Sequence, residues 1–528
     1  MKLKTGLLLL PLLVFFSCRK EKATWDSNWV APLVSDTLSL KDYVNDSTIV
    51  ESGSVYNLDL TRTIADFGIE DLIAIPDTTI SQTYSIVVSS LSIPPGTSIV
   101  NQIEEHTIDL APIELKKIRI SQGSIKLKIY NPVASKVYFT VQLPGVTQNG
   151  ITFEQNYFAP AAVGSNPGTV EAILNISGYD IDLTGMNGGE VNVLQSKLII
   201  NSDPLGSNVT VTNQHVFKVD ADFKNVKIDY AKGYFGNKVF TDTTTYTIDL
   251  LNGLTAGSID IPSSAIQLSI TNGMKIEGRA TLTKLSNTNT LGSTVNLSSS
   301  LIGNPIYMDA ATGSAWSYVP STQTISLDAT NSNLENYIEN LGNKHTVGYK
   351  IELNPWGNTS GGFNEIYSTS RLKVKLKAQM PMAIGADGLT LRDTFDIDIS
   401  QDLEKSHIES GSLVLNATNA FPMNSSVKIY LLDENGTTLH SVNGSSPIES
   451  SLYGSVDPKD GMMKTNSEVI FVLPENVLAD LANVKNIAVE TTFNTPNPAT
   501  TLNAQQAIPV GAFIAVKLKT KFVFKAII

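Results

Sequence analysis

The sequence contains a single cysteine, Cys18, among 528 residues. A disulfide within one chain is therefore impossible, and a zinc site built from several thiolates is excluded. The five histidines are scattered, without the paired spacing that metal-binding motifs use: His106, His215, His345, His407 and His440. We expect neither a metal site nor a cofactor.

Sequence motifs for nucleotide binding and hydrolysis are also missing. The chain has no G-x-G-x-x-G, Walker loop, H-E-x-x-H or G-x-S-x-G motif. A Ser-His-Asp triad stays possible, because its members need not be adjacent in sequence. The formal net charge of −12 argues against nucleic-acid binding and against electrostatic docking on anionic lipid.

The first 17 residues have the pattern of an export signal. Lys2 and Lys4 precede an apolar run over residues 7–16, which is too short to span a membrane. The sequence FFSC that ends at Cys18 resembles the lipobox of bacterial lipoproteins, in which the cysteine is lipidated and becomes the new N-terminus. Because exported chains avoid stray thiols, the one that is retained supports lipidation of Cys18. The alternative is an ordinary signal peptide that contains a cysteine.

The segment after Cys18 carries a second resemblance. A polar stretch at residues 19–24 is followed by WDSNWVAPL at 25–33 and by turn signals at 75–79 and 93–97. Together with the lipobox, these features resemble uncharacterised outer-membrane lipoproteins of the Bacteroidota. The resemblance implies anchoring in the outer membrane through acyl chains. Surface-export signals in that phylum place acidic residues after the cysteine, whereas residues 19–22 are mostly basic, so periplasmic and surface orientations both stay open.

The rest of the chain is organised by a stretch that occurs three times, at residues 120–131, 261–272 and 408–419. In each copy, alternating apolar positions run to an asparagine that is followed by turn-forming residues. This pattern is typical of a half-buried strand that enters a turn. The closing residues, Asn131, Asn272 and Asn419, are 141 and 147 residues apart.

Other strand patterns recur in the same order, including a lysine-alternating strand around Val226, Val374 and Val516. A period of about 145 residues is the size of a domain and not of a solenoid repeat. Several antiparallel strands per unit, joined by Gly, Pro and Asn turns, favour a β-sandwich. The strand closed by Asn-Pro also resembles the WHy type of late-embryogenesis-abundant sandwich.

The predicted fold is therefore all-β, with tandem antiparallel β-sandwich domains after a lipidated N-terminal segment. The predicted divisions are a lipoprotein signal peptide, a lipidated tether with an N-terminal β segment, and three homologous sandwiches. They cover residues 1–17, 18–100, 101–235, 236–385 and 386–528.

Four aromatic residues are the candidate ligand-binding residues. Tyr307, Trp316 and Tyr318 lie in a turn-rich insertion over residues 303–320, and Trp356 follows in the same unit. Aromatic rings on the loops of an exported sandwich can stack on sugars or anchor a partner. The alternative is that such a ring closes the end of its own sandwich.

We expect a non-enzymatic outer-membrane lipoprotein whose tandem β-domains serve as a binding or scaffolding module for a glycan or an envelope protein. The alternative is a glycan-binding accessory protein or a carbohydrate-acting hydrolase. Acids two apart on a strand, such as Asp180 and Asp182, could serve calcium binding or glycoside hydrolysis, but they also suit a solvated strand face.

The Bacteroidota resemblance also implies O-glycosylation at Asp-Ser or Asp-Thr followed by a small or aliphatic residue. Four positions meet this rule, and all are expected in turns because of their polar sequence context: Thr37, Ser47, Thr78 and Thr243.

Overall fold

The computed structural model describes residues 24–39, 49–261, 264–314, 316–396, 408–496 and 505–527. Antiparallel strands make up nearly all of its regular structure, and the few helices are short. The prediction of an all-β, sandwich-type fold is confirmed. Within the described ranges, no helix is both long and apolar enough to cross a membrane.

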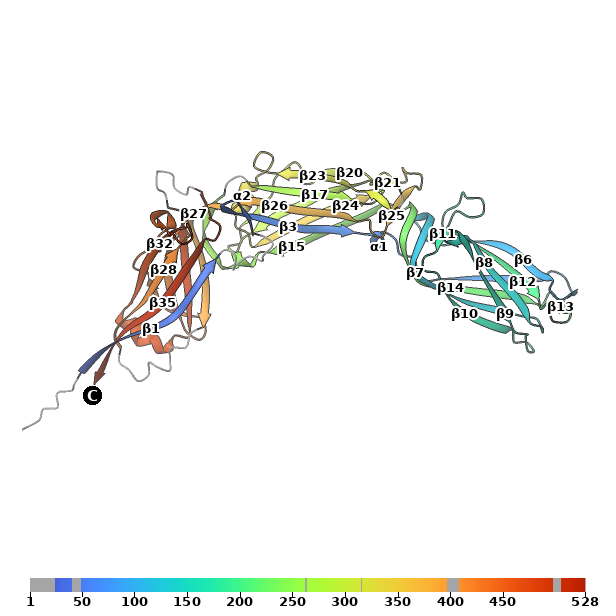
Figure 1. The fold of residues 1–528 in the computed structure, drawn as a ribbon, viewed down its shortest axis with the longest axis horizontal. Helices are drawn as coiled ribbons and strands as arrows, with labels where there is room; N and C mark the ends of the chain where they lie inside the picture. Colours follow the sequence, from blue (N-terminus) through green and yellow to red (C-terminus); the bar gives the residue numbers. More distant parts are fainter. Residues whose placement is uncertain are drawn as a thin grey trace, which may run out of the picture.

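Three β-sandwiches follow one another in a row (Figure 1). One sheet of each sandwich is built around the strand that ends in the repeated asparagine. This strand pairs on one side with a later strand and on the other side with the last strand of the unit. In the first sandwich this sheet has the order β10 (Gly168–Asn175), β7 (Glu114–Asn131), β14 (Val216–Tyr234). The matching orders are β23 (Ser321–Leu327), β17 (Ala265–Asn272), β26 (Leu372–Pro381) in the middle sandwich, and β32 (Met463–Leu473), β28 (Ile408–Asn419), β35 (Phe513–Ile527) in the third.

The facing sheets are also alike. In the first sandwich the order is β9 (Ile151–Ala159), β8 (Val137–Gln148), β12 (Val193–Ser202), β6 (Ser98–Thr107). In the middle one it is β20 (Pro305–Met308), β18 (Gly278–Thr288), β24 (Lys344–Leu353), β15 (Lys238–Thr247). The third has β30 (Thr438–Asn443), β29 (Asn424–Leu432), β33 (Asn486–Asn494), β27 (Ala383–Asp396), β16 (Leu254–Asp260).

The N-terminal segment contributes strands to every sandwich. β1 (Thr24–Ser39) pairs with β35, β3 (Val55–Phe67) pairs with β26, and β4 (Thr78–Ser85) pairs with β14, all antiparallel. The segment therefore passes from the third sandwich to the first before the repeated units begin. As a result, the start and the end of the described chain lie together at one tip of the row, and β13 (Val209–Val211) lies near the opposite tip (Figure 1).

Alternating burial explains why these segments form sandwiches. Along β17, every second residue is buried, including Ile266, Leu268 and Ile270, while the residues between them are only partly buried. Because successive side chains of a strand point to opposite faces, such a strand covers a core with one face only. In the first sandwich the two sheets meet through residues such as Leu127 of β7 and Phe139 of β8.

The three repeated asparagines are buried and make the same three hydrogen bonds. The side-chain amide of each donates to the carbonyl four residues ahead and to a carbonyl in a later connection, and its oxygen accepts from the backbone N–H two residues ahead. The partners, in that order, are Ser135, Pro160 and Val133 for Asn131; Ile276, Asp309 and Met274 for Asn272; and Met423, Glu449 and Phe421 for Asn419. The side chain thus ties together the turn between the two sheets.

The sandwiches are joined by short passages. β14 leads to β15 through residues 235–237, and β26 leads to β27 through Met382 alone. At the second passage, the N–H of Met382 donates to the carbonyl of Tyr56 at 2.8 Å, and the buried Tyr56 hydroxyl accepts from Gly511 at 2.9 Å. Residues 68–77 of the N-terminal segment pass between the middle and first sandwiches in the opposite direction, so that joint is spanned twice.

Replacing Asn272 with alanine should destabilise the middle sandwich by about 3 kcal/mol, because two carbonyls and one N–H in a buried turn lose their partner. Hydrogen exchange of the β17 amides measures the opening free energy. The control is Asn175→Ala, which removes one exposed hydrogen bond to the Ser177 N–H and should cost less than about 1 kcal/mol. Equal losses in the two variants would contradict the role assigned to Asn272.

Candidate functional site

The predicted aromatic residues lie near the joint between the middle and first sandwiches. The short strand β25 (Asn364–Tyr367) comes from the middle unit but pairs with residues 230–233 of β14 in the first sandwich. The hairpin of β21 (Thr312–Ser314) and β22 (Ser317–Val319) carries Trp316 in its turn and lies beside β25 (Figure 1).

Trp316 and Tyr318 both pack on the buried ring of Tyr367. The ring centroids lie 4.9 Å apart for Trp316 and 5.6 Å apart for Tyr318, which is nearly parallel to Tyr367 at 8°. Trp316 stays 43% exposed. The ring of Trp316 therefore does not fill the core of its own sandwich. It covers the joint, and about half of its surface faces solvent.

A charged network lies beneath these rings. Glu365 of β25 accepts a hydrogen bond from the hydroxyl of Tyr230 in the first sandwich at 2.8 Å and from the Lys275 ammonium at 2.5 Å. Burial raises the pKa of Glu365, but the hydrogen bonds from Lys275 and Tyr230 outweigh it and hold that pKa below its usual value. Glu365 is therefore a charged link between the two sandwiches.

Arg119 extends this network towards Trp316. Its guanidinium donates to both carboxylate oxygens of Asp180, at 2.8 and 3.1 Å, and lies 5.9 Å from the centre of the Trp316 ring. Lys117 approaches the same carboxylate at 3.6 Å. Asp180 is thus held in ion pairs on a strand face, the arrangement expected for a structural carboxylate.

Tyr307 and Trp356 form a separate pair. Their rings stack at 5.9 Å with an angle of 29°, and they are 58% and 50% exposed. Among the described residues, no ring contact joins this pair to Trp316 or Tyr318. The structure therefore divides the four predicted residues into two pairs, of which the Tyr307–Trp356 pair offers more free ring surface.

Two further aromatic residues at the joint were not predicted. Tyr367 is the ring on which Trp316 and Tyr318 pack, and the exposed Phe363 lies 4.1 Å from the Lys116 ammonium and 4.9 Å from that of Lys232, both in the first sandwich. The loop before Phe363 also accepts a hydrogen bond from Lys116 at the Gly361 carbonyl, at 2.9 Å. The only sequence signal was the density of Gly, Asn and aromatic residues over 354–367.

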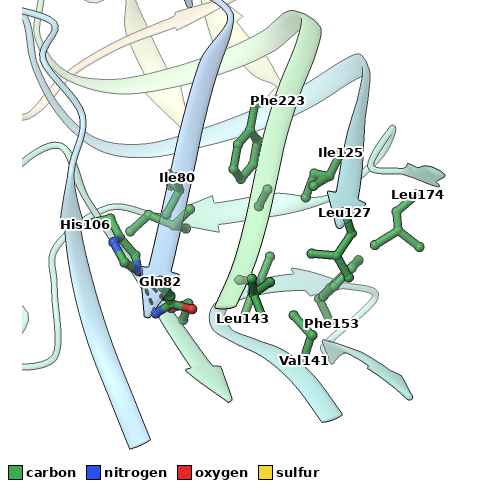
Figure 2. Close-up of a pocket in the computed structure, with 14 residues that line it drawn as sticks. Ile80, Gln82, His106, Ile125, Leu127, Val141, Leu143, Phe153, Leu174 and Phe223 are labelled. Carbon is green, nitrogen blue, oxygen red and sulfur yellow. Dashed lines mark hydrogen bonds between the residues drawn. The ribbon is translucent and has the colours of Figure 1, made fainter. Parts of the chain in front are cut away.

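A small cavity of about 30 Å³ lies between the sheets of the first sandwich (Figure 2). Its walls are mostly apolar side chains from both sheets, such as Leu127, Leu143 and Phe223, while Gln82 and His106 meet at one side. A volume of this size holds about one or two water molecules. It is therefore too small for a sugar or another organic substrate.

The polar side of this cavity contains a serine–histidine pair. The Nε2 atom of His106 lies 2.9 Å from the Ser196 hydroxyl and 3.0 Å from the Gln82 amide nitrogen. The amide nitrogen of Gln82 also donates to the Glu104 carboxylate at 3.2 Å. Because a carboxylate only accepts, this contact identifies the atom of Gln82 that faces His106 as the nitrogen, which is a donor. Because Ser196 is buried, its hydroxyl cannot reach a substrate, and the cluster serves to satisfy polar groups inside the core.

The remaining predicted positions are spread over the molecule. Cys18 and Ser47 lie outside the described residues. Thr37 and Thr243 lie within the edge strands β1 and β15, so the prediction that all four glycosylation candidates occupy turns is wrong for these two. Thr78 opens β4 directly after the irregular segment 73–77. In the described ranges, no group of three or more His, Cys, Asp or Glu residues is placed to hold a metal ion.

Comparison with known proteins identifies no family. No family model matches the chain, and no curated protein matches it. Among solved structures, the chain is similar to a Parabacteroides distasonis protein described as a "putative secreted protein". The identity is 10% and the TM-score 0.27, over 94% of this chain and 99% of the other. A likeness of this size does not establish a shared fold.

Single alanine substitutions of Tyr367 and Trp316 should distinguish a ring that is buried in the core from a ring that covers it. Tyr367→Ala should lower the unfolding free energy by about 3–5 kcal/mol, as expected for a buried aromatic residue. Trp316→Ala should cost only about 1 kcal/mol, the value of one aromatic pair. Denaturant unfolding checks both values. A loss for Trp316→Ala as large as that for Tyr367→Ala would place Trp316 in the core.

Acidification should weaken the first sandwich through His106. Burial lowers the pKa of His106, so the folded state binds fewer protons than the unfolded state below about pH 6.5. The stabilising contribution of the neutral His106 is therefore complete above the pKa of the unfolded state. It is lost as the pH falls from that value towards the lower pKa of the folded state.

The measurement is the unfolding free energy of wild type and His106→Gln between about pH 7.5 and 5.5. The variant should lose less stability over this interval. Burial also lowers the pKa of His345, but this residue is present in both proteins and cancels in the comparison. Identical pH profiles would contradict the assignment to His106.

Proposed function

We propose that this chain is a non-enzymatic, lipid-anchored envelope protein whose three sandwiches form an elongated scaffold that presents a binding surface away from the membrane. The observation that carries the proposal is the course of the N-terminal segment. Its strands β1, β3 and β4 fix the start of the chain to the third sandwich and run along the other two. An anchor at Cys18 would thus hold one tip, with the first sandwich farthest from it.

The length of the tether supports this arrangement. Cys18 and Thr24, where β1 begins, are six positions apart, and an extended chain over that distance covers about 20 Å. A lipid on Cys18 would therefore keep the third sandwich next to the bilayer. The proposed location is the outer membrane, as the resemblance of residues 1–100 implies.

The absence of enzymatic activity is part of the proposal. The serine–histidine pair is buried, and the paired acids of the strands are engaged in ion pairs or hydrogen bonds: Asp180 with Arg119, Asp220 with Lys218 and Ser81, and Asp222 with Thr79. These contacts support a structural role for the carboxylates.

Mass spectrometry of the mature N-terminus tests the anchor. We expect a chain that begins at Cys18 and carries acyl chains, and that fractionates with the outer membrane. The control is Cys18→Ser, which should abolish the acylated form. An unmodified N-terminus downstream of Cys18 in the wild type would reject the proposal.

Glycan binding is the second candidate, and the exposed Tyr307–Trp356 stack favours it. Two half-exposed rings on one surface can pack against the apolar face of a sugar. Trp356→Ala should weaken capture on a glycan array by about 2 kcal/mol of binding free energy or more, with little change in unfolding. Tyr453→Ala, which removes an exposed ring of the third sandwich, should leave capture unchanged. Equal capture by all three proteins would remove this candidate.

A further inference from the structure

The outer face of the third sandwich carries lysines without acidic partners. Lys517, Lys519 and Lys521 alternate along β35 and are exposed, whereas Thr520 and Phe522 between and beside them are buried. Within the described part of the chain, none of the three lysines forms an ion pair.

The neighbours of these lysines on the adjacent strands are uncharged. Directly opposite residues of antiparallel strands share a face, and their side chains are close together. The opposite residues are Ser35, Pro32 and Val30 on β1, and Asn416, Val414 and Ser412 on β28. The positive charge of the lysines is therefore not compensated by either neighbouring strand.

The same face carries ion pairs in the other two sandwiches, although Lys375 of the middle row has none among the described residues. In the middle one, Lys373 lies 3.6 Å from Asp66 and Lys377 lies 3.1 Å from Asp59, both acids belonging to β3. In the first, Lys218 and Lys224 lie 2.8 and 3.2 Å from Asp220 and Asp77. The fold thus accommodates acidic partners on this face, and only the third sandwich leaves its lysine row unmatched among the described residues.

Exposed apolar side chains accompany the lysines. Val30 is 57% exposed and lies opposite Lys521, while Val472 is 65% exposed and lies opposite Ser412 on the other side. Ammonium groups beside exposed methyl groups suit a lipid surface, where the charge meets phosphates and the apolar groups enter the interface. A soluble anion would gain nothing from the valines.

We propose that this face, defined by Lys517, Lys519, Lys521, Val30 and Val472, docks on the anionic headgroups of the membrane that holds the anchor. The inference rests on the proposed lipid anchor, because the tether keeps the third sandwich within about 20 Å of the bilayer. The net charge of −12 is an average over the whole chain, whereas docking depends on the local charge of the contacting face.

The test uses the chain from residue 18 onward with Cys18→Ser, which retains every described residue and carries no lipid. Its cosedimentation is measured with vesicles of phosphatidylcholine alone and with vesicles that contain phosphatidylglycerol as about one third of the lipid. The variant is Lys517→Gln, Lys519→Gln and Lys521→Gln combined. The matched control makes the same three changes at Lys373, Lys375 and Lys377 of the middle sandwich.

We expect binding to the anionic vesicles only, reduced about 100-fold in the Lys517/519/521 variant and changed less than about twofold in the control. Val472→Ser should also weaken it. Thermal unfolding confirms that each variant is folded. An equal loss in variant and control, no loss in the variant, or displacement by inorganic phosphate at matched ionic strength would overturn the proposal. Retained binding by Val472→Ser would point to a soluble polyanion and likewise overturn it.

The outcome is independent of the anchor itself. Because the tested chain is not acylated, vesicle binding reports the lysine face whether or not Cys18 carries a lipid in the cell. The mass of the native N-terminus reports the anchor separately.

Discussion

The antiparallel ladders that β1, β3 and β4 form with β35, β26 and β14 determine how the whole protein is arranged. Each ladder adds a strand beside the last strand of a repeated unit, which the unit does not supply itself. Because the same segment continues from the middle sandwich to the first, that joint is crossed by two described stretches, residues 68–77 and 235–237. The ladder of β1 with β35 joins the two ends of the described chain, so the first described strand can find its partner only after the last strand is made.

The repeated units have kept their internal geometry and diverged on their surfaces. The asparagine turn makes the same three hydrogen bonds in all three units, because the path between the two sheets needs a side chain that both donates and accepts there. By contrast, Trp316 and Phe363 belong to additions that contact the first sandwich, and the unmatched lysines of β35 occur in the third alone. Binding sites placed on such additions leave the core of the fold unchanged.

The sequence predicted the fold class because alternation of apolar residues is a local signal and is repeated. The recurring order of strands within the units followed from the same signal. The pairing partners of β1, β3 and β4 did not, because an edge strand has the same alternation whichever sheet it joins. Thr37 and Thr243 were predicted to lie in turns because their neighbours in the sequence are polar, but they lie within strands.

For the candidate site, the sequence identified the exposed aromatic residues but not their surroundings. Trp316 and Tyr318 were recognisable by composition, whereas their contact with Tyr367 and the link from Glu365 to Tyr230 depend on a strand that crosses to another sandwich. The pairing of His106 with Ser196 joins strands 90 residues apart and has no local pattern. Contacts of this kind are set by tertiary packing, which single-sequence patterns do not encode.

Hydrogen–deuterium exchange of the intact chain tests the central claim most directly. If the N-terminal segment completes all three sandwiches, the paired amides of β1, β3 and β4 will exchange slowly, with protection comparable to that of β7, β17 and β28. Rapid exchange throughout residues 24–39, 55–67 and 78–85, alongside protected repeat strands, would show that the sandwiches form without this segment and would contradict the account.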